Sequence, residues 1–153
     1  MGRRDPARSR LLKRKAKNMK NSKVLKVVLF VSGLIAASIG GAVLVMPAAF
    51  YASNGIDLGG NVSLLNEIRA SGGALLAAGI LIISGSFVAS MTFTAVVLAS
   101  LLYLSYGLSR ILSFGIDGMP SEGLVQAAAL EIVIGVVCVC VFAKYRERQT
   151  ESA

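Results

Sequence analysis

Four long apolar stretches fill the chain from Val24 onward, and short polar segments separate them. A helix needs about 20 apolar residues to cross the roughly 30 Å of hydrocarbon in a bilayer, and each stretch is that long. The pattern predicts an all-α fold, an integral membrane bundle of four antiparallel transmembrane helices. The predicted spans are residues 24–46, 64–88, 91–113 and 122–143.

Residues at the ends of these stretches predict where the helices stop and start. Pro47 has no amide hydrogen and cannot continue the first helix. Ser63 and Ser121 are residue types that cap helix N-termini, so we expect them to cap the second and fourth helices. A few uncharged residues near Ser90 fit a tight reversal between the second and third spans. The two longer loops therefore lie on one side of the membrane.

Two further patterns describe how the helices pair. The second span carries small residues on which another helix can approach closely, namely Gly72, Gly73, Ala77 and Ala78. Gly55-Ile56-Asp57 after the first span is echoed by Gly115-Ile116-Asp117 after the third. A duplication would give two repeated helical hairpins, and a chance match is the alternative.

The charge distribution predicts the orientation. The chain has 153 residues, is 55% hydrophobic, and carries 16 Lys and Arg against 8 Asp and Glu. Most basic residues lie at or before Lys26, and three more follow the last span, so the positive-inside rule places both termini in the cytoplasm. Anionic lipid attracts such a basic segment. No aromatic residue interleaves it to stack on bases, so we do not expect nucleic acid as a partner.

These observations predict three regions. Residues 1–23 form a basic, disordered cytoplasmic tail, residues 24–143 a four-helix membrane domain, and residues 144–153 a short basic cytoplasmic tail. Met19 begins a segment that would serve equally well as a start, so residues 1–18 are either an extension or a start-site artefact.

Several kinds of chemistry are excluded or disfavoured by composition. The chain contains no histidine, which excludes Ser-His and Cys-His nucleophiles. Its two cysteines, Cys138 and Cys140, are two positions apart, so on a helix they point in different directions. We therefore expect no metal site and no cofactor.

Ionisable residues interrupt three of the spans, and charges inside a bilayer are candidates for function. Glu67 and Arg69 are two positions apart and cannot simply neutralise each other across one helix face. Glu131 falls near the bilayer centre, so it should be protonated or meet Arg69 or Arg110. The structural alternatives are a solvated helix start for Glu67 and a purely structural ion pair for Glu131.

The third span adds a polar stripe, because Tyr103, Tyr106, Gly107 and Arg110 share one side of a helix. The stripe forms either a pocket wall with a fixed cation or an interfacial belt of tyrosine and snorkelling arginine. The candidate ligand-binding or charge cluster is Glu67, Arg69, Tyr106, Arg110 and Glu131. The outer-loop candidates are Asp57, Asn61 and Asp117.

Motifs across residues 24–143 also carry a family resemblance: Met46-Pro47, Phe50-Tyr51, Gly55-Ile56-Asp57, Asn61, residues 64–73, residues 103–110 and Asp117-Gly118. Together they resemble small bacterial four-helix membrane proteins classed as domain of unknown function 4345. The resemblance implies a bacterial inner membrane and no established activity. A looser similarity to DoxX-like four-helix membrane proteins implies association with a redox or quinone-linked system. Neither assigns a catalytic role to any position.

Three classes of function stay open. The favoured one is a binding or accessory membrane protein whose outward-facing polar site, between helices two to four, holds a lipid-like or anionic amphiphile. The second is an intramembrane enzyme acting on a lipid or isoprenoid, with Glu131 or Glu67 as general acid or base. The third is a subunit of an oligomeric proton-coupled transporter. We expect membrane lipids as partners, together with a second copy or another membrane protein.

Overall fold

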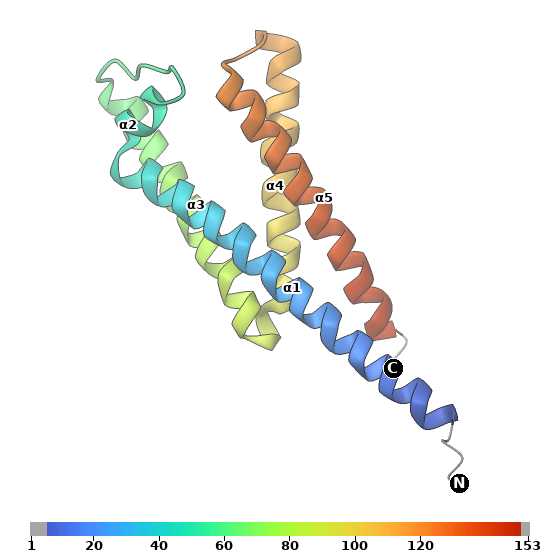
Figure 1. The fold of residues 1–153 in the computed structure, drawn as a ribbon. Helices are drawn as coiled ribbons and strands as arrows, with labels where there is room; N and C mark the ends of the chain where they lie inside the picture. The colour runs from blue at the N-terminus through green and yellow to red at the C-terminus, as the bar shows by residue number, and fades with distance from the viewer. Residues whose placement is uncertain (1–5, 151–153) are drawn as a thin grey trace.

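The computed structural model describes the backbone of residues 6–150 and the side chains of residues 23–144. Within residues 6–150 the fold is all-α, without a strand, which confirms the predicted class. Figure 1 shows the arrangement of the helices. They are α1 (Pro6–Val45), α2 (Pro47–Ala52), α3 (Val62–Phe87), the short 3-10 helix η1 (Ala89–Met91), α4 (Thr92–Asp117) and α5 (Glu122–Thr150).

Four segments are long and apolar enough to cross a membrane, so this is a multi-pass membrane protein. They are Lys23–Val45, Val62–Phe87, Ala89–Asp117 and Glu122–Lys144. The third helix continues past Ser113, the predicted end of its span, to Asp117. The first helix begins at Pro6 and so extends through the segment for which the sequence predicts disorder. The tail predictions for residues 1–5 and 151–153 lie outside the described residues.

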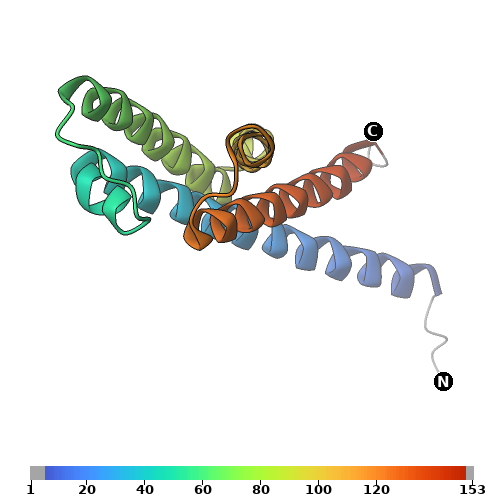
Figure 2. The same cartoon turned by 90° about the horizontal axis from the view of Figure 1, so that it is seen from above.

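The helices form two hairpins. Helix α1 packs along α3, and α4 packs along α5. The hairpins meet mainly through α3 and α4 near η1, whereas within residues 6–150 no Cα atom of α3 lies within 8 Å of a Cα atom of α5. Toward the end that carries α2 and the loops 53–61 and 118–121, which we call the loop end, the hairpins diverge (Figures 1 and 2). The fold is therefore a V closed near η1.

Glycines bring α1 and α3 into backbone contact. A Cβ atom on Gly40 of α1 would lie 2.8 Å from the carbonyl oxygen of Gly72 on α3, and one on Gly79 would lie 2.8 Å from the Gly33 carbonyl oxygen. Positions 72 and 79 are two helical turns apart and share one face. The predicted small-residue face was therefore only partly right, because Gly72 lies in the interface while Ala77 is exposed.

The core lies in the half of the V near η1. Its buried residues come from α1, α3, α4 and α5, and they are Leu25, Leu29, Ile82, Ala95, Val96, Ala99 and Cys138. A smaller cluster of Val43, Leu58 and Ile68 supports the loop after α2. The buried apolar cluster therefore lies near η1, whereas the charged pair between the hairpins, Arg110 and Glu131, lies toward the loop end.

The helix ends correct one of the two predicted caps and add a contact to the other. The side chain of Asn61, rather than that of Ser63, caps α3 by accepting from the Leu64 amide at 3.1 Å. Ser121 stands directly before α5, where its carbonyl oxygen accepts from the Leu124 and Val125 amides, and its hydroxyl donates to the carbonyl oxygen of Asn54 at 3.1 Å. Pro47 stands at the start of α2, so α1 ends at Val45 as its missing amide hydrogen requires.

Candidate functional site

A cavity of about 160 Å³ lies between the two hairpins in the loop half of the protein. Its walls are mostly aliphatic, with Ile39 and Val43 from α1, Leu75 from α3 and Leu124 from α5 among them. Aromatic and polar groups from α2 and α4 complete the lining, including Tyr51, Asn54, Tyr103 and Tyr106. The sequence predicted a site among the second, third and fourth spans, and α1 and α2 also contribute walls.

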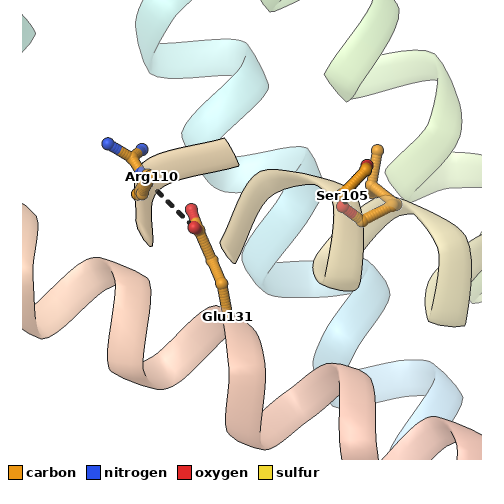
Figure 3. Close-up of polar contacts among 4 residues, drawn as sticks. Ser105, Arg110 and Glu131 are labelled. Carbon is orange, nitrogen blue, oxygen red and sulfur yellow. Dashed lines mark hydrogen bonds and ion pairs between the residues drawn. The ribbon is translucent and has the colours of Figure 1, made fainter. Parts of the chain in front are cut away.

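Arg110 and Glu131 form an ion pair at this cavity. The Arg110 Nε atom donates to Glu131 Oε2 at 3.0 Å, and Figure 3 shows the two side chains reaching toward each other from α4 and α5. The side chains are 30% and 16% exposed, so the pair is largely withdrawn from the surface. The sequence predicted either Arg69 or Arg110 as the partner of Glu131, and in the structure the partner is Arg110.

The approach of α4 and α5 explains why these residues meet. Gly107 lies one turn before Arg110, and a Cβ atom there would lie 2.6 Å from the Ile132 side chain. Gly135 on α5 is packed in the same way against Leu104, at 2.7 Å. The two glycines let the helices pack closely enough for the charged side chains to reach each other.

The ion pair leaves hydrogen-bonding groups free at the cavity. A guanidinium has five N–H donors, and Glu131 takes the one on Nε. Among residues 23–144, no hydrogen bond joins Nη1 or Nη2 of Arg110, or Oε1 of Glu131, to another group. Figure 3 shows the terminal nitrogens of Arg110 directed away from Glu131. The cavity therefore has donors and an acceptor for a polar head.

Glu67 and Arg69 do not join this pair. Arg69 uses Nη1 to donate to the carbonyl oxygen of Leu44 at the end of α1, and the same nitrogen lies 3.4 Å from the Val45 carbonyl oxygen. Glu67 is exposed on α3. Neither residue lines the cavity. The predicted cluster of five is thus divided, with Tyr106, Arg110 and Glu131 at the cavity and the other two outside it.

The outer-loop candidates have local structural roles. Asp57 accepts from the Gly59 amide at 2.9 Å, and Asp117 accepts from the Ser113 hydroxyl at 2.8 Å. Asn61 caps α3. All three are exposed, and none lines the cavity. Their positions explain turns and helix ends rather than a binding site.

Tyr103 closes the cavity toward η1. Its hydroxyl donates to the backbone carbonyl oxygen of Ser32, which joins α4 to α1. Both residues are buried, and Cys138 is buried in the core on the same side. Cys138 is buried and Cys140 exposed, as their spacing on one helix predicted. The sequence placed Tyr103 on the polar stripe but did not select it, because its partner is a backbone atom of a distant helix.

Asn54 and Ser121 close part of the opposite end. The Ser121 hydroxyl at the start of α5 bonds to the carbonyl oxygen of Asn54, which follows α2. A Cβ atom on Gly123 would lie 3.1 Å from the Asn54 side-chain oxygen. This contact joins the hairpins at the loop end, and Figure 2 shows the start of α5 reaching toward the α2 region. Two loops that the sequence could not pair are therefore in contact.

Comparison with protein families shows which family the chain belongs to. A family model described as Domain of unknown function (DUF4345) matches residues 24–142. The chain belongs to this family. No curated protein and no solved structure matches the chain. The family covers all four spans and both cavity charges, so the Arg110–Glu131 pair lies within the shared domain. The similarity to DoxX-like proteins stays a prediction.

The positions of the acidic and sulfur-containing side chains bear on metal binding. Within the part of the chain that the structure describes, no group of three or more Cys, Asp or Glu side chains is placed to hold a metal ion. The polar side chains that line the cavity and could contact a ligand are those of Tyr51, Asn54, Ser71, Tyr103, Tyr106, Arg110 and Glu131.

Proposed function

We propose that this protein binds a lipid-like amphiphile between its two hairpins. One observation carries the proposal: a single cavity has both mostly aliphatic walls and Arg110 N–H groups without a partner among residues 23–144. This cavity lies toward the end where the hairpins diverge. Binding sites for small molecules combine apolar walls with a few placed polar groups. The polar head would lie at Arg110 and Glu131, and the tail along the aliphatic walls.

The size of the cavity limits how much of the ligand it encloses. Its volume is about 160 Å³. This is enough for a small head and the first part of one chain. The remainder of the tail would extend into the bilayer toward the end where the hairpins diverge (Figure 1).

The closed base of the cavity supports binding over passage through a single chain. Tyr103, hydrogen-bonded to the Ser32 carbonyl, and the apolar core beyond it lie between the cavity and the end of the protein near η1. A ligand would therefore enter and leave by the loop end or from the bilayer.

The proposal includes the orientation of the protein in the membrane. Basic residues before Lys26 and after the last span favour both termini in the cytoplasm of a bacterial cell, with the domain in the inner membrane. The loop end and the cavity would then lie toward the outer side. Membrane lipids are the first source of amphiphile that the site would meet.

Native mass spectrometry of the protein extracted with its lipids tests the proposal, with one variant that fills the cavity and one that does not. Ala127 lines the cavity, whereas Ala129 is exposed on the same helix and does not. We expect a bound amphiphile in the wild type and in Ala129→Phe, and its loss in Ala127→Phe. A wild type without bound amphiphile, or equal occupancy in both variants, would overturn the proposal.

A further inference from the structure

The charge of the cavity lining narrows the class of ligand. Among the described lining residues, Arg110 and Glu131 are the charged ones, and they carry opposite charges 3.0 Å apart. The lining therefore has no net charge. An anionic head held by the terminal nitrogens of Arg110 would also lie close to the Glu131 carboxylate. Attraction of the anionic head to Arg110 would be opposed by its repulsion from Glu131.

The hydrogen-bonding groups that are free at the cavity also favour a ligand with an uncharged head. Arg110 offers donors on Nη1 and Nη2, and Glu131 offers Oε1 as an acceptor. A head that bears hydroxyl groups suits both residues, because a hydroxyl oxygen can accept from the guanidinium and a hydroxyl hydrogen can be donated to the carboxylate. A carboxylate, sulfate or phosphate dianion can only accept, and an ammonium can only donate. Either charged head would leave one member of the pair without a new partner.

We propose that the Arg110–Glu131 pair selects an uncharged, hydroxyl-bearing, single-chain amphiphile over anionic and cationic amphiphiles of the same length. The inference rests on the proposed function and specifies its ligand. The small cavity volume favours a compact head on one chain over a two-chain phospholipid. The Tyr106 hydroxyl, which also lines the cavity, lies one helical turn before Arg110 and provides a second polar group for a head with two hydroxyls.

Competition binding in phosphatidylcholine nanodiscs tests this selectivity. The probe is radiolabelled 1-decanoylglycerol, with empty nanodiscs as background. The competitors share its chain length and are unlabelled 1-decanoylglycerol, decyl sulfate and decyltrimethylammonium. For the wild type, we expect the uncharged competitor to displace the probe at concentrations about tenfold lower than either charged one.

The variant Glu131→Gln converts the site to one with an uncompensated cation. We expect its ranking to reverse, with decyl sulfate gaining about tenfold. Glu67→Gln removes an exposed carboxylate that does not line the cavity, so it should keep the wild-type ranking. The wild-type ranking is decisive by itself if Glu131→Gln does not fold.

The outcomes separate the two proposals. Probe binding with decyl sulfate or decyltrimethylammonium as the best wild-type competitor would overturn the selectivity while leaving amphiphile binding in place. An unchanged ranking in folded Glu131→Gln would also overturn it. No saturable probe binding to the wild type above empty nanodiscs, together with no amphiphile by native mass spectrometry, would overturn both.

Discussion

Arg69 on α3 donates a hydrogen bond to the carbonyl oxygen of Leu44, and so caps the C-terminal end of α1. The last carbonyl groups of a helix have no partner within it, and Pro47 cannot donate to them. A cation at this end also interacts favourably with the helix dipole. Arg69, which the sequence predicted to belong to a ligand site, thus joins α3 to α1.

The first prediction concerns this cap. Arg69→Ala should lower the free energy of unfolding by about 1 kcal/mol, because it removes a charged donor from the end of α1. Denaturation in mixed micelles measures the change. Glu67→Gln, an exposed neighbour on α3, is the matched control and should be close to neutral. Equal stability of the two variants would contradict the capping role, and amphiphile binding should persist in both.

The second prediction uses adjacent glycines on α1. A Cβ atom on Gly40 would lie 2.8 Å from the Gly72 carbonyl oxygen, whereas one on Gly41 has no atom within 4 Å. Gly40→Ala should therefore destabilise the protein by about 1–3 kcal/mol, the range for overpacking a tight interface. Gly41→Ala should be neutral or slightly stabilising, since alanine is the better helix former. The same unfolding assay compares them, and similar values would contradict the close approach of α1 and α3.

The sequence predicted the helices well because length and apolarity alone decide whether a segment can span a bilayer. The sequence left two arginines, Arg69 and Arg110, as possible partners of Glu131 and did not distinguish between them. The choice between them depends on the register of α4 against α5, which Gly107 and Gly135 set through contacts with Ile132 and Leu104. Such contacts between helices leave no periodic signal in either helix.

The cap of α3 and the role of Arg69 escaped prediction for a related reason. Asn61 and Ser63 are both capping residue types, two positions apart, and the backbone path of the preceding loop selects Asn61. Arg69 reaches Leu44 only because the glycine interface fixes how far α3 slides along α1. The divergence of the hairpins, and with it the cavity, likewise depends on packing between distant segments.

The third prediction concerns the base of the cavity. Tyr103→Phe removes the hydroxyl that donates to the Ser32 carbonyl while keeping the ring in place. Hydrogen bonds between membrane helices average about 0.6 kcal/mol, so the free energy of unfolding should fall by roughly that amount. Tyr106→Phe is the control, because Tyr106 is more exposed and joins no such bond in residues 23–144. A loss as large for Tyr106→Phe as for Tyr103→Phe would contradict the assignment of Tyr103 to the α1–α4 contact.

The last prediction tests the contact between the hairpins at the loop end. A Cβ atom on Gly123 would lie 3.1 Å from the Asn54 side-chain oxygen, so cysteines at these two positions are close enough to oxidise to a disulfide. In a background of Cys138→Ala and Cys140→Ser, Asn54→Cys with Gly123→Cys should cross-link rapidly under mild oxidation, as a mobility shift on non-reducing gels. Asp57→Cys with Gly123→Cys is the control and should cross-link more slowly, because no atom of Asp57 lies within 4 Å of a Cβ atom at position 123.

The same cross-link probes the path of the ligand. Asn54 lines the cavity, so a disulfide to position 123 would hold its loop-end wall closed. If the amphiphile enters between α2 and α5, the oxidised protein should exchange bound radiolabelled 1-decanoylglycerol severalfold more slowly than the reduced protein. If it enters from the bilayer between α3 and α4, oxidation should leave the exchange rate unchanged. Equal cross-linking of the test and control pairs would show instead that the hairpins are not held together at this end.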